Sequence, residues 1–366
     1  MVLAALVCCQ SNSKTQVHLM KTLFGSLTGG KEIYAHVIGN AVGMKATIID
    51  LGATVVSLSV PDRNGVFADV VLGYDNPEAY YQGSSFFGAI VGRYGNRIGK
   101  GTFRLDEKVY HVTINNGENH LHGGTKGFDK VFWSVLSQSD SSLTLQYVSR
   151  DGEEGYPGTA IITVTFTITA GNALRIDYEG TTDKPTIFNP THHSYFNLTG
   201  NPKKTILDHQ LMIAAEKMTP VDAGLIPTGI FADVANTPFD FRTPQMIGAR
   251  IEDHSEQLVF GKGYDHNWVL NNYSGAVRKI AELYDPESGR VMELLSDQPG
   301  LQFYSGNFLD GSIRGKNGTA YRHRTGLCLE AQCYPDSPNR PEWPSATLRP
   351  GSPYHQTAIY KFTTKQ

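Results

Sequence analysis

The chain has 366 residues, a formal net charge of −3 and 40% hydrophobic residues, so it is long enough to bury a large core and carries no excess of basic charge. With charge nearly balanced and no run rich in lysine and arginine, we expect neither nucleic acid nor an anionic membrane surface as a partner. Glycine (38), tyrosine (18) and phenylalanine (17) are abundant, and charged residues make up only 18%. This composition favours many strands joined by tight turns, with an aromatic-lined site for a neutral polar ligand.

The first 20 residues differ in character from the rest of the chain. Residues 2–9 are apolar throughout and end in Cys8 and Cys9, and residues 10–16 are polar. This order resembles the end of a lipoprotein signal, although no basic segment precedes it. Two interpretations stay open: a remnant of a lipoprotein or secretory signal, with a periplasmic or lipid-anchored protein, or a disordered tail on a cytoplasmic protein. The apolar run is too short to span a bilayer.

Strand patterns follow one another from residue 21 to the C-terminus. The clearest is a hairpin over residues 162–178, in which apolar residues alternate with threonines and Ala-Gly-Asn at 170–172 forms the turn. Further strands are expected at residues 56–60, 69–72, 102–112, 143–147, 280–284, 290–295, 301–304, 327–332 and 357–363. Short helical turns are expected at residues 76–81 and 244–251. No linker divides residues 21–366, so we predict one all-β domain, a large antiparallel β-sandwich with few short helices.

Two stretches carry groups that suit the binding of hydroxyl-rich ligands. Residues 92–98 (Gly-Arg-Tyr-Gly-Asn-Arg-Ile) hold Asn96 and Arg97 in a turn. There the guanidinium either binds ligand oxygens or braces the loop through backbone carbonyls. Asp265, in residues 261–268, either accepts bonds from adjacent hydroxyls or forms a local turn with its own backbone. Two aromatic side chains of that stretch could cover the apolar face of a ring: Tyr264 and Trp268.

Residues 119–124 (Asn-His-Leu-His-Gly-Gly) could bind either a metal ion or a polar ligand. His120 and His122 would share one side of an extended strand and could form a metal pair, as in cupins. That interpretation needs further ligands, and none follows at short spacing. A ligand-contacting His122, beside glycines that allow close approach, is therefore favoured. Cys328 and Cys333 form no recognisable metal or redox motif.

Residues 189–198 (Asn-Pro-Thr-His-His-Ser-Tyr-Phe-Asn-Leu) are the strongest candidate for a catalytic stretch. If they are extended, His193 lies on a polar face and His192 on the opposite, half-apolar face. His193 suits proton transfer near neutral pH, although a lone histidine in a strand is more often structural. Glu330 stands in the otherwise uncharged residues 326–332, where a carboxylate is either paired or functional. A histidine acid and a glutamate base from separate strands would form a pair for reversible proton transfer.

These stretches, in this order, resemble the aldose 1-epimerases, also called galactose mutarotases. Residues 299–309 (Pro-Gly-Leu-Gln-Phe-Tyr-Ser-Gly-Asn-Phe-Leu) and 329–332 (Leu-Glu-Ala-Gln) also carry the resemblance, which extends over residues 22–364. It implies a β-supersandwich fold and an isomerase that interconverts the α and β anomers of aldohexoses such as D-galactose and D-glucose. The family pattern commonly has alanine where this chain has Gly95, a departure that touches no catalytic position.

The resemblance also implies roles for individual residues. His193 matches the general acid that protonates the ring oxygen, and Glu330 matches the general base that takes the proton of the C1 hydroxyl. The implied substrate-binding residues are Asn96, Arg97, His122, Asp265 and Gln302. The chemistry needs no metal or cofactor, although a structural metal is left open, and the partner is a small aldose. We expect a monomer or a weak dimer.

Two other functions remain as alternatives at this stage. A non-catalytic carbohydrate-binding β-sandwich would keep Arg97 and Asp265 but would not need both His193 and Glu330. An epimerase relative acting on a phosphorylated sugar would need an additional basic pocket, which we do not identify in the sequence. Residue types alone do not fix the preferred aldose, because discrimination among hydroxyls depends on loop geometry.

Overall fold

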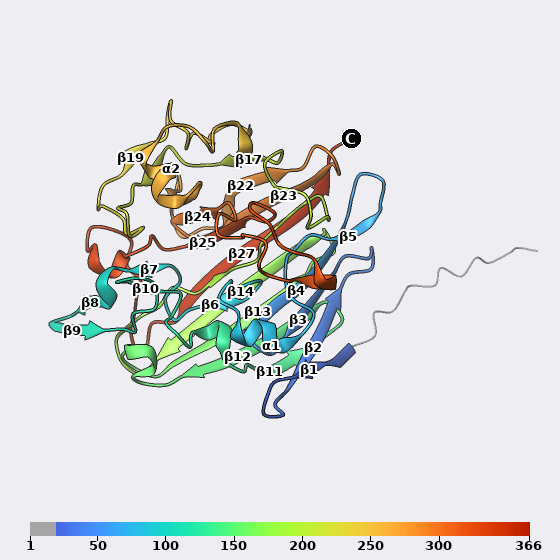
Figure 1. The fold of residues 1–366 in the computed structure, drawn as a ribbon. Helices are drawn as coiled ribbons and strands as arrows, with labels where there is room; N and C mark the ends of the chain where they lie inside the picture. The colour runs from blue at the N-terminus through green and yellow to red at the C-terminus, as the bar shows by residue number, and fades with distance from the viewer. Residues whose placement is uncertain (1–19) are drawn as a thin grey trace, which may run out of the picture.

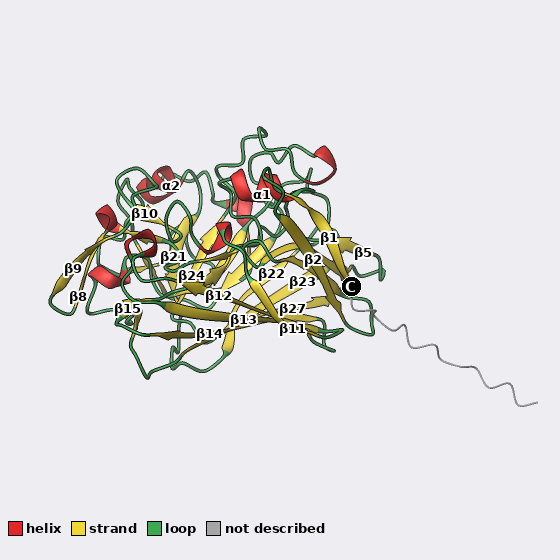
Figure 2. Cartoon of the chain, turned by 90° about the horizontal axis from the view of Figure 1, so that it is seen from below, coloured by secondary structure: helices red, strands yellow, loops and turns green. Residues whose placement is uncertain are grey.

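The computed structural model describes residues 20–366, and the predicted signal remnant or tail lies almost wholly outside the described residues. Strands dominate the described part, and its two α-helices are short: α1 (Pro77–Gln82) and α2 (Glu256–Gly261). Figure 2 shows the helices on the side of the molecule away from the long strands β13 and β14. The helical turn expected at residues 76–81 corresponds to α1, whereas that at 244–251 is only a 3-10 turn (Ile247–Ala249), and α2 was not expected.

The largest sheet has nine antiparallel strands, whose long members lie side by side in Figure 1. In spatial order they are β11 (Ser134–Gln138), β12 (Ser142–Ser149), β13 (Ala160–Ile168), β14 (Ala173–Thr182), β27 (Tyr354–Thr364), β23 (Arg290–Ser296), β22 (Arg278–Tyr284), β17 (Gln210–Ile213) and β20 (Gln245–Met246). The predicted hairpin is confirmed: β13 pairs with β14 from Ala160 opposite Thr182 to Ile168 opposite Leu174.

Two five-stranded antiparallel sheets complete the sandwich. The first contains β1 (Met20–Ser26), β2 (Glu32–Gly39), β3 (Lys45–Ile49), β4 (Thr54–Pro61) and β5 (Phe67–Asp69). The second contains β19 (Ala232–Asp233), β18 (Lys217–Thr219), β21 (Asp265–Val269), β24 (Gly300–Tyr304) and β25 (Cys328–Gln332). The partner strand expected at residues 69–72 ends at Asp69, because its carboxylate accepts the backbone N–H groups of Leu58 and Val71 and interrupts the ladder.

Four two-stranded pairs connect these sheets: β6 (Ile90–Val91) with β16 (Thr191–His192), β7 (Arg97–Ile98) with β10 (His120–Leu121), β8 (Thr102–Leu105) with β9 (Lys108–His111), and β15 (Thr186–Ile187) with β26 (Thr347–Leu348). One apolar core lies between the nine-stranded sheet and the two smaller ones, with Phe166, Leu58 and Phe303 fully buried in it. The alternation of β13 puts its isoleucine, valine and phenylalanine into this core and leaves its threonines half-buried on the outer face. The predicted all-β antiparallel sandwich is therefore confirmed.

Residues 189–198, whose faces were assigned on the condition that they are extended, form a strand only at β16. The backbone N–H groups beyond it bond to three different neighbours: His193 to Ala89, Phe196 to Leu327 and Asn197 to Val70. A segment that changes partner at nearly every step cannot form a regular ladder. It crosses between sheets, and every residue from 188 to 198 is buried.

Candidate active site

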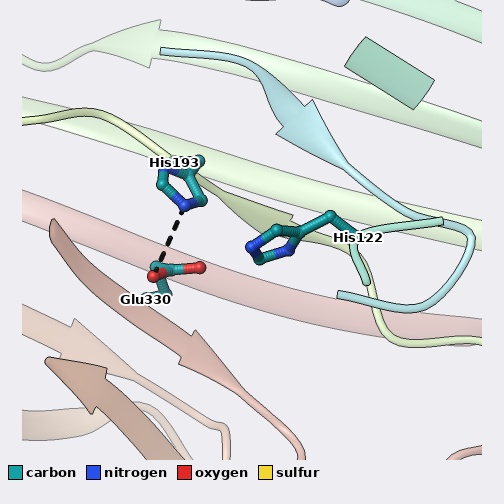
Figure 3. Close-up of side chains that lie close together, drawn as sticks. All are labelled: His122, His193 and Glu330. Carbon is teal, nitrogen blue, oxygen red and sulfur yellow. Dashed lines mark ion pairs between the residues drawn. The ribbon is translucent and has the colours of Figure 1, made fainter. Parts of the chain in front are cut away.

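His193 and Glu330 lie together inside the protein, as predicted from the sequence. His193 directly follows β16, and its backbone is held on both sides, since its N–H donates to Ala89 O (2.9 Å) and its carbonyl accepts from Gly88 N (3.0 Å). Glu330 is at the centre of β25. Nε2 of His193 lies 3.8 Å from Oε1 of Glu330, and both side chains are more than nine-tenths buried. Figure 3 shows the two groups facing each other from separate segments.

His192 lies on the other side of this segment, as expected. Its ring packs against Tyr360 of β27 with centroids 5.7 Å apart. The neighbouring Thr191 donates its hydroxyl to the backbone oxygen of Ala331 (3.0 Å). The alternation therefore correctly separates the two histidines.

His122 points its ring toward the other two groups from one side in Figure 3. It follows β10 in a left-handed backbone conformation (φ 50°). Its ring centroid lies 5.0 Å from that of His193. The following residue must be glycine, because a Cβ on Gly123 would lie 1.7 Å from the oxygen of Gly92. The glycines therefore allow this loop to bring His122 against His193 and Glu330.

The predicted alignment of His120 with His122 is wrong. His120 contacts the backbone oxygen of Thr113 through Nδ1 (2.6 Å) and the hydroxyl of Tyr156 through Nε2, away from His122. The left-handed turn at His122 breaks the alternation that would have put both rings on one side. These two residues therefore form no metal pair.

His122, His193 and Glu330 place potential ligand atoms within 4.8 Å of one another, close enough to raise the question of a metal ion. Nδ1 of His122, however, accepts the backbone N–H of Asn96 (3.1 Å). A neutral histidine that accepts at Nδ1 carries its proton on Nε2. This tautomer offers an N–H donor to the site and not the lone pair that a metal requires.

The remaining predicted binding residues join the same cluster. Gln302 on β24 lies opposite Glu330 on β25, and its amide donates to Asp265 Oδ1 (2.7 Å). Asp265 on β21 in turn faces Arg97 of β7, with Arg97 Nη2 and Asp265 Oδ2 3.7 Å apart. Asn96, in the left-handed region (φ 67°), accepts the N–H of Arg97 with its own side-chain oxygen (2.9 Å). All seven predicted site residues are thus connected through successive contacts.

Burial controls the ionisation of this cluster. It raises the pKa of Glu330 well above its usual value, with the Asp265 carboxylate adding to the effect and Arg97 opposing it. Burial also lowers the pKa of His193 to about 4 and that of His122 well below its usual value. Both directions favour the uncharged forms. For the His193–Glu330 pair this means that burial favours a neutral imidazole beside a protonated carboxyl.

Several buried polar atoms of the site have no hydrogen-bond partner within residues 20–366. They include Oε1 of Gln302 and Oε2 of Glu330. The same is true of Oδ1 of Asn267 and of both carboxamide atoms of Gln332, two residues that sequence reasoning missed. Buried acceptors and donors without partners are costly unless a ligand or water satisfies them. The site is therefore prepared for a polar ligand with several hydroxyl groups.

The aromatic side chains at the site are not the ones expected. Tyr264 and Trp268 are fully buried in the core, where their polar atoms donate to the backbone oxygens of Pro238 and Phe239. They cannot cover a ligand. Because Asp265 faces the site, the strand alternation sends its neighbour Tyr264 and, three positions on, Trp268 to the opposite side.

Two other aromatic rings pack against His193 instead, and a third packs against one of them. Phe86 contacts the rings of both His122 (4.7 Å between centroids) and His193 (5.7 Å), and Tyr195 contacts His193 (5.3 Å). Tyr304 packs against Tyr195 (5.8 Å). Phe86 has a left-handed backbone (φ 56°), which is rare for a bulky residue and found mainly at functional sites. Its only sequence signal was the glycine on either side of residues 84–87.

Comparison with known proteins agrees with this architecture. The family model for aldose 1-epimerase matches residues 34–361. Galactose mutarotase from Mus musculus is 43% identical over 349 residues, which cover 95% of this chain and 99% of the relative. Aldose 1-epimerase from Escherichia coli (strain K12) is 38% identical over 327 residues, 88% of this chain and 93% of the relative.

Solved structures give the same result at the level of the fold. An aldose epimerase homologue from C. elegans superimposes with a TM-score of 0.83 at 31% identity, covering 91% of this chain and all of that one. The family model spans most of the chain, and the similarity to these relatives runs nearly from end to end. The chain belongs to the aldose 1-epimerase family.

Proposed function

We propose that this protein is an aldose 1-epimerase that interconverts the α and β anomers of aldohexoses such as D-galactose and D-glucose, as part of hexose metabolism. The observation that supports this most directly is the buried His193–Glu330 pair, 3.8 Å apart, in a cluster with unsatisfied hydrogen-bonding atoms. A binding protein would need the hydroxyl-binding groups but would gain nothing from an acid and a base in contact. Relatives named galactose mutarotase support the same conclusion.

In the proposed reaction His193 donates its Nε2 proton to the ring oxygen while Glu330 removes the proton of the C1 hydroxyl. The bond between C1 and the ring oxygen breaks, and the sugar opens to an aldehyde with a free hydroxyl on C5. After rotation about the C1–C2 bond, the C5 hydroxyl adds to the other face of the carbonyl. Each proton returns to the group it came from, and the sugar closes as the other anomer.

The proton count agrees with the ionisation of the site. With cyclic sugar bound, the pair is protonated on His193 and ionised on Glu330, and after ring opening the proton is on Glu330. Both states hold one proton. Burial, which lowers the pKa of His193 and raises that of Glu330, favours the second state, so the proximity of the two groups must stabilise the first. Two proton transfers on a neutral sugar need no cofactor or metal, and we include this in the proposal.

The other site residues have binding roles in this scheme. His122 donates from Nε2 to a sugar oxygen, because its Nδ1 is occupied by Asn96. Arg97, Asp265, Gln302 and the amide nitrogen of Asn96 bind hydroxyl groups. The phosphorylated-sugar alternative is less well supported, since Arg97 already faces the carboxylate of Asp265 and leaves little excess positive charge for a phosphate.

The partner in this proposal is a small aldose. Within residues 20–366, no helix has the length and apolarity needed to cross a membrane. We propose no nucleic-acid partner, as expected from the balanced charge of the chain. We also propose that the protein is a monomer or a weak dimer.

Polarimetry tests the function directly. Added to freshly dissolved α-D-galactose, the protein should accelerate the decay of optical rotation in proportion to its concentration. Sugar binding detected by calorimetry without any acceleration would establish the binding-module alternative instead. Rates measured across galactose, glucose, xylose and arabinose would identify the preferred aldose.

A further inference from the structure

The second nitrogen of His193 has a partner that the proposed reaction does not yet use. Cys328 opens β25, two residues before Glu330, so the two side chains lie on the same face of the strand. Its Sγ lies 3.6 Å from Nδ1 of His193. Cys328 is fully buried and is not in a disulfide. We propose that Cys328 is a positioning residue for the general acid: its sulfur accepts the Nδ1–H of His193 and so directs Nε2 toward the sugar ring oxygen.

The geometry assigns the two ring nitrogens to different tasks. Nε2 faces Glu330 and the centre of the site, whereas Nδ1 faces Cys328. Within residues 20–366, Cys328 is the one side chain that hydrogen-bonds the His193 ring, and the backbone of His193 itself contributes a further hydrogen bond that raises the pKa of the ring. The aromatic neighbours of the ring restrict its tilt but do not distinguish one nitrogen from the other. Cys328 at Nδ1, together with Glu330 at Nε2, therefore sets which nitrogen points at the substrate.

The chemistry of the acid step also favours a thiol at this position. The proton that His193 donates and recovers is the one on Nε2, so Nδ1 stays protonated throughout the cycle and needs an acceptor. Sulfur is a weak acceptor, so it orients the ring without strongly stabilising the imidazolium. A carboxylate at this position would stabilise the imidazolium and weaken it as an acid.

The thiol stays neutral in this environment. Burial raises the pKa of Cys328 well above its usual value, and the Glu330 and Asp265 carboxylates add to this effect. The titratable groups around His193 are Glu330 and Cys328 from β25, His122 from the loop after β10, and His192 and Tyr195 from its own segment. Of these, Glu330 is the one that can approach His193 as an anion. The inference rests on the proposed acid role of His193.

The chain offers a matched control for a test by mutation. Cys333 is also buried and free, five residues further on, but its described contacts do not include His193. Cys328→Ala should lower kcat about tenfold, as expected for losing a hydrogen bond that orients a catalytic group, with KM changed less than about twofold. Cys333→Ala should leave kcat within about twofold. Equal effects of the two substitutions on kcat and KM would overturn the proposal.

Two further measurements test the same point, and the first uses the unmodified protein, so it does not depend on how well a variant folds. Nitrogen-15 NMR of the unmodified protein should show neutral His193 protonated on Nδ1, and a proton on Nε2 instead would overturn the proposal. Cys328→Ser supplies a stronger acceptor, so the acid limb of the kcat/KM profile should move to higher pH, and an unmoved limb would count against the inference. Activity of the unmodified protein separates this question from the function, because a protein that never accelerates mutarotation fails the function itself.

Discussion

Two regions of this sandwich use the same strand geometry for opposite purposes. In β13 and β14, apolar side chains face the core and threonines or charged residues face outward, so each strand has one buried face and one face toward solvent. In β21, β24 and β25 nearly every residue is buried on both faces. One face packs Trp268 and Phe303 into the core, while the other holds Asp265, Gln302 and Glu330 in the site.

The first region increases the free energy of unfolding, whereas the polar face of the second region lowers it. An apolar face that leaves water contributes roughly 25 cal/mol for each Å² buried. A buried carboxyl or carboxamide without a partner has the opposite effect, costing about 1–3 kcal/mol. The polar face of the second region therefore makes sense as a ligand site, and substitutions in the two regions should have different consequences.

The largest effect is expected for Glu330→Gln. The amide cannot accept the proton of the C1 hydroxyl, so the rate of mutarotation should fall by about 10²–10⁴-fold while sugar binding is retained. The free energy of unfolding should not decrease, because a neutral amide replaces a buried carboxyl with an unpartnered oxygen. Polarimetry and urea denaturation measure the two quantities. A variant with more than a tenth of the original rate would refute the role of Glu330 as the base.

Phe166→Ala should give the opposite result in the first region. Phe166 is fully buried at the centre of β13, and truncating it should lower the free energy of unfolding by about 3–5 kcal/mol. The kcat/KM of the protein that remains folded should change less than about twofold. The matched control is Thr165→Ala on the outer face of the same strand, which should alter stability by about 0.5 kcal/mol or less. A large loss of kcat/KM in folded Phe166→Ala would break the separation between the regions.

Asp265→Asn tests the binding side of the polar face with a nearly isosteric change. Arg97 loses the charge that faces it, and a sugar hydroxyl loses its acceptor, whereas the Gln302 amide can still bond to the asparagine oxygen. Hydrogen bonds to charged groups contribute about 1.5–3 kcal/mol, so kcat/KM should fall by about 10–100-fold, mainly through KM. Steady-state polarimetry over a range of galactose concentrations would show this, and a loss confined to kcat would contradict a binding role.

The last prediction concerns His192, which lies between the two regions. Burial lowers the pKa of His192 to about 3, whereas histidine in the unfolded chain titrates near 6.5. Between these two pKa values His192 binds a proton in the unfolded chain but not in the folded protein. Its contribution to stability is therefore complete above pH 6.5 and is lost as the pH falls. Relative to His192→Phe, the unmodified protein should lose about 1.4 kcal/mol of stability for each pH unit between pH 6 and 4.

Urea denaturation of both proteins at several pH values measures this difference. Only the difference in the free energy of unfolding between the two proteins is used. In that difference the contributions of the other buried histidines and carboxyls cancel, and a packing effect of the phenylalanine adds only a constant that does not depend on pH. Parallel stability curves for the two proteins would show that His192 becomes charged in the folded state.

The sequence by itself determined the class of fold and the identity of the chemical groups. The alternation of apolar residues and threonines in residues 162–168 defines a face in any antiparallel sandwich, because side chains of a strand alternate strictly. Glu330 was recognisable because a carboxylate in an apolar strand needs a partner or a function. The family motifs added the assignment of His193 as its counterpart, which the residue pattern alone left open.

Only the tertiary structure decided which neighbours these groups have. The left-handed turn at His122 separates it from His120, and the bonding of residues 193–197 to three different segments ends the strand after His192. Phe86 and Cys328 lie 242 positions apart in the numbering yet both contact His193. Such contacts depend on how sheets and loops pack against each other, and no local period in the sequence records them.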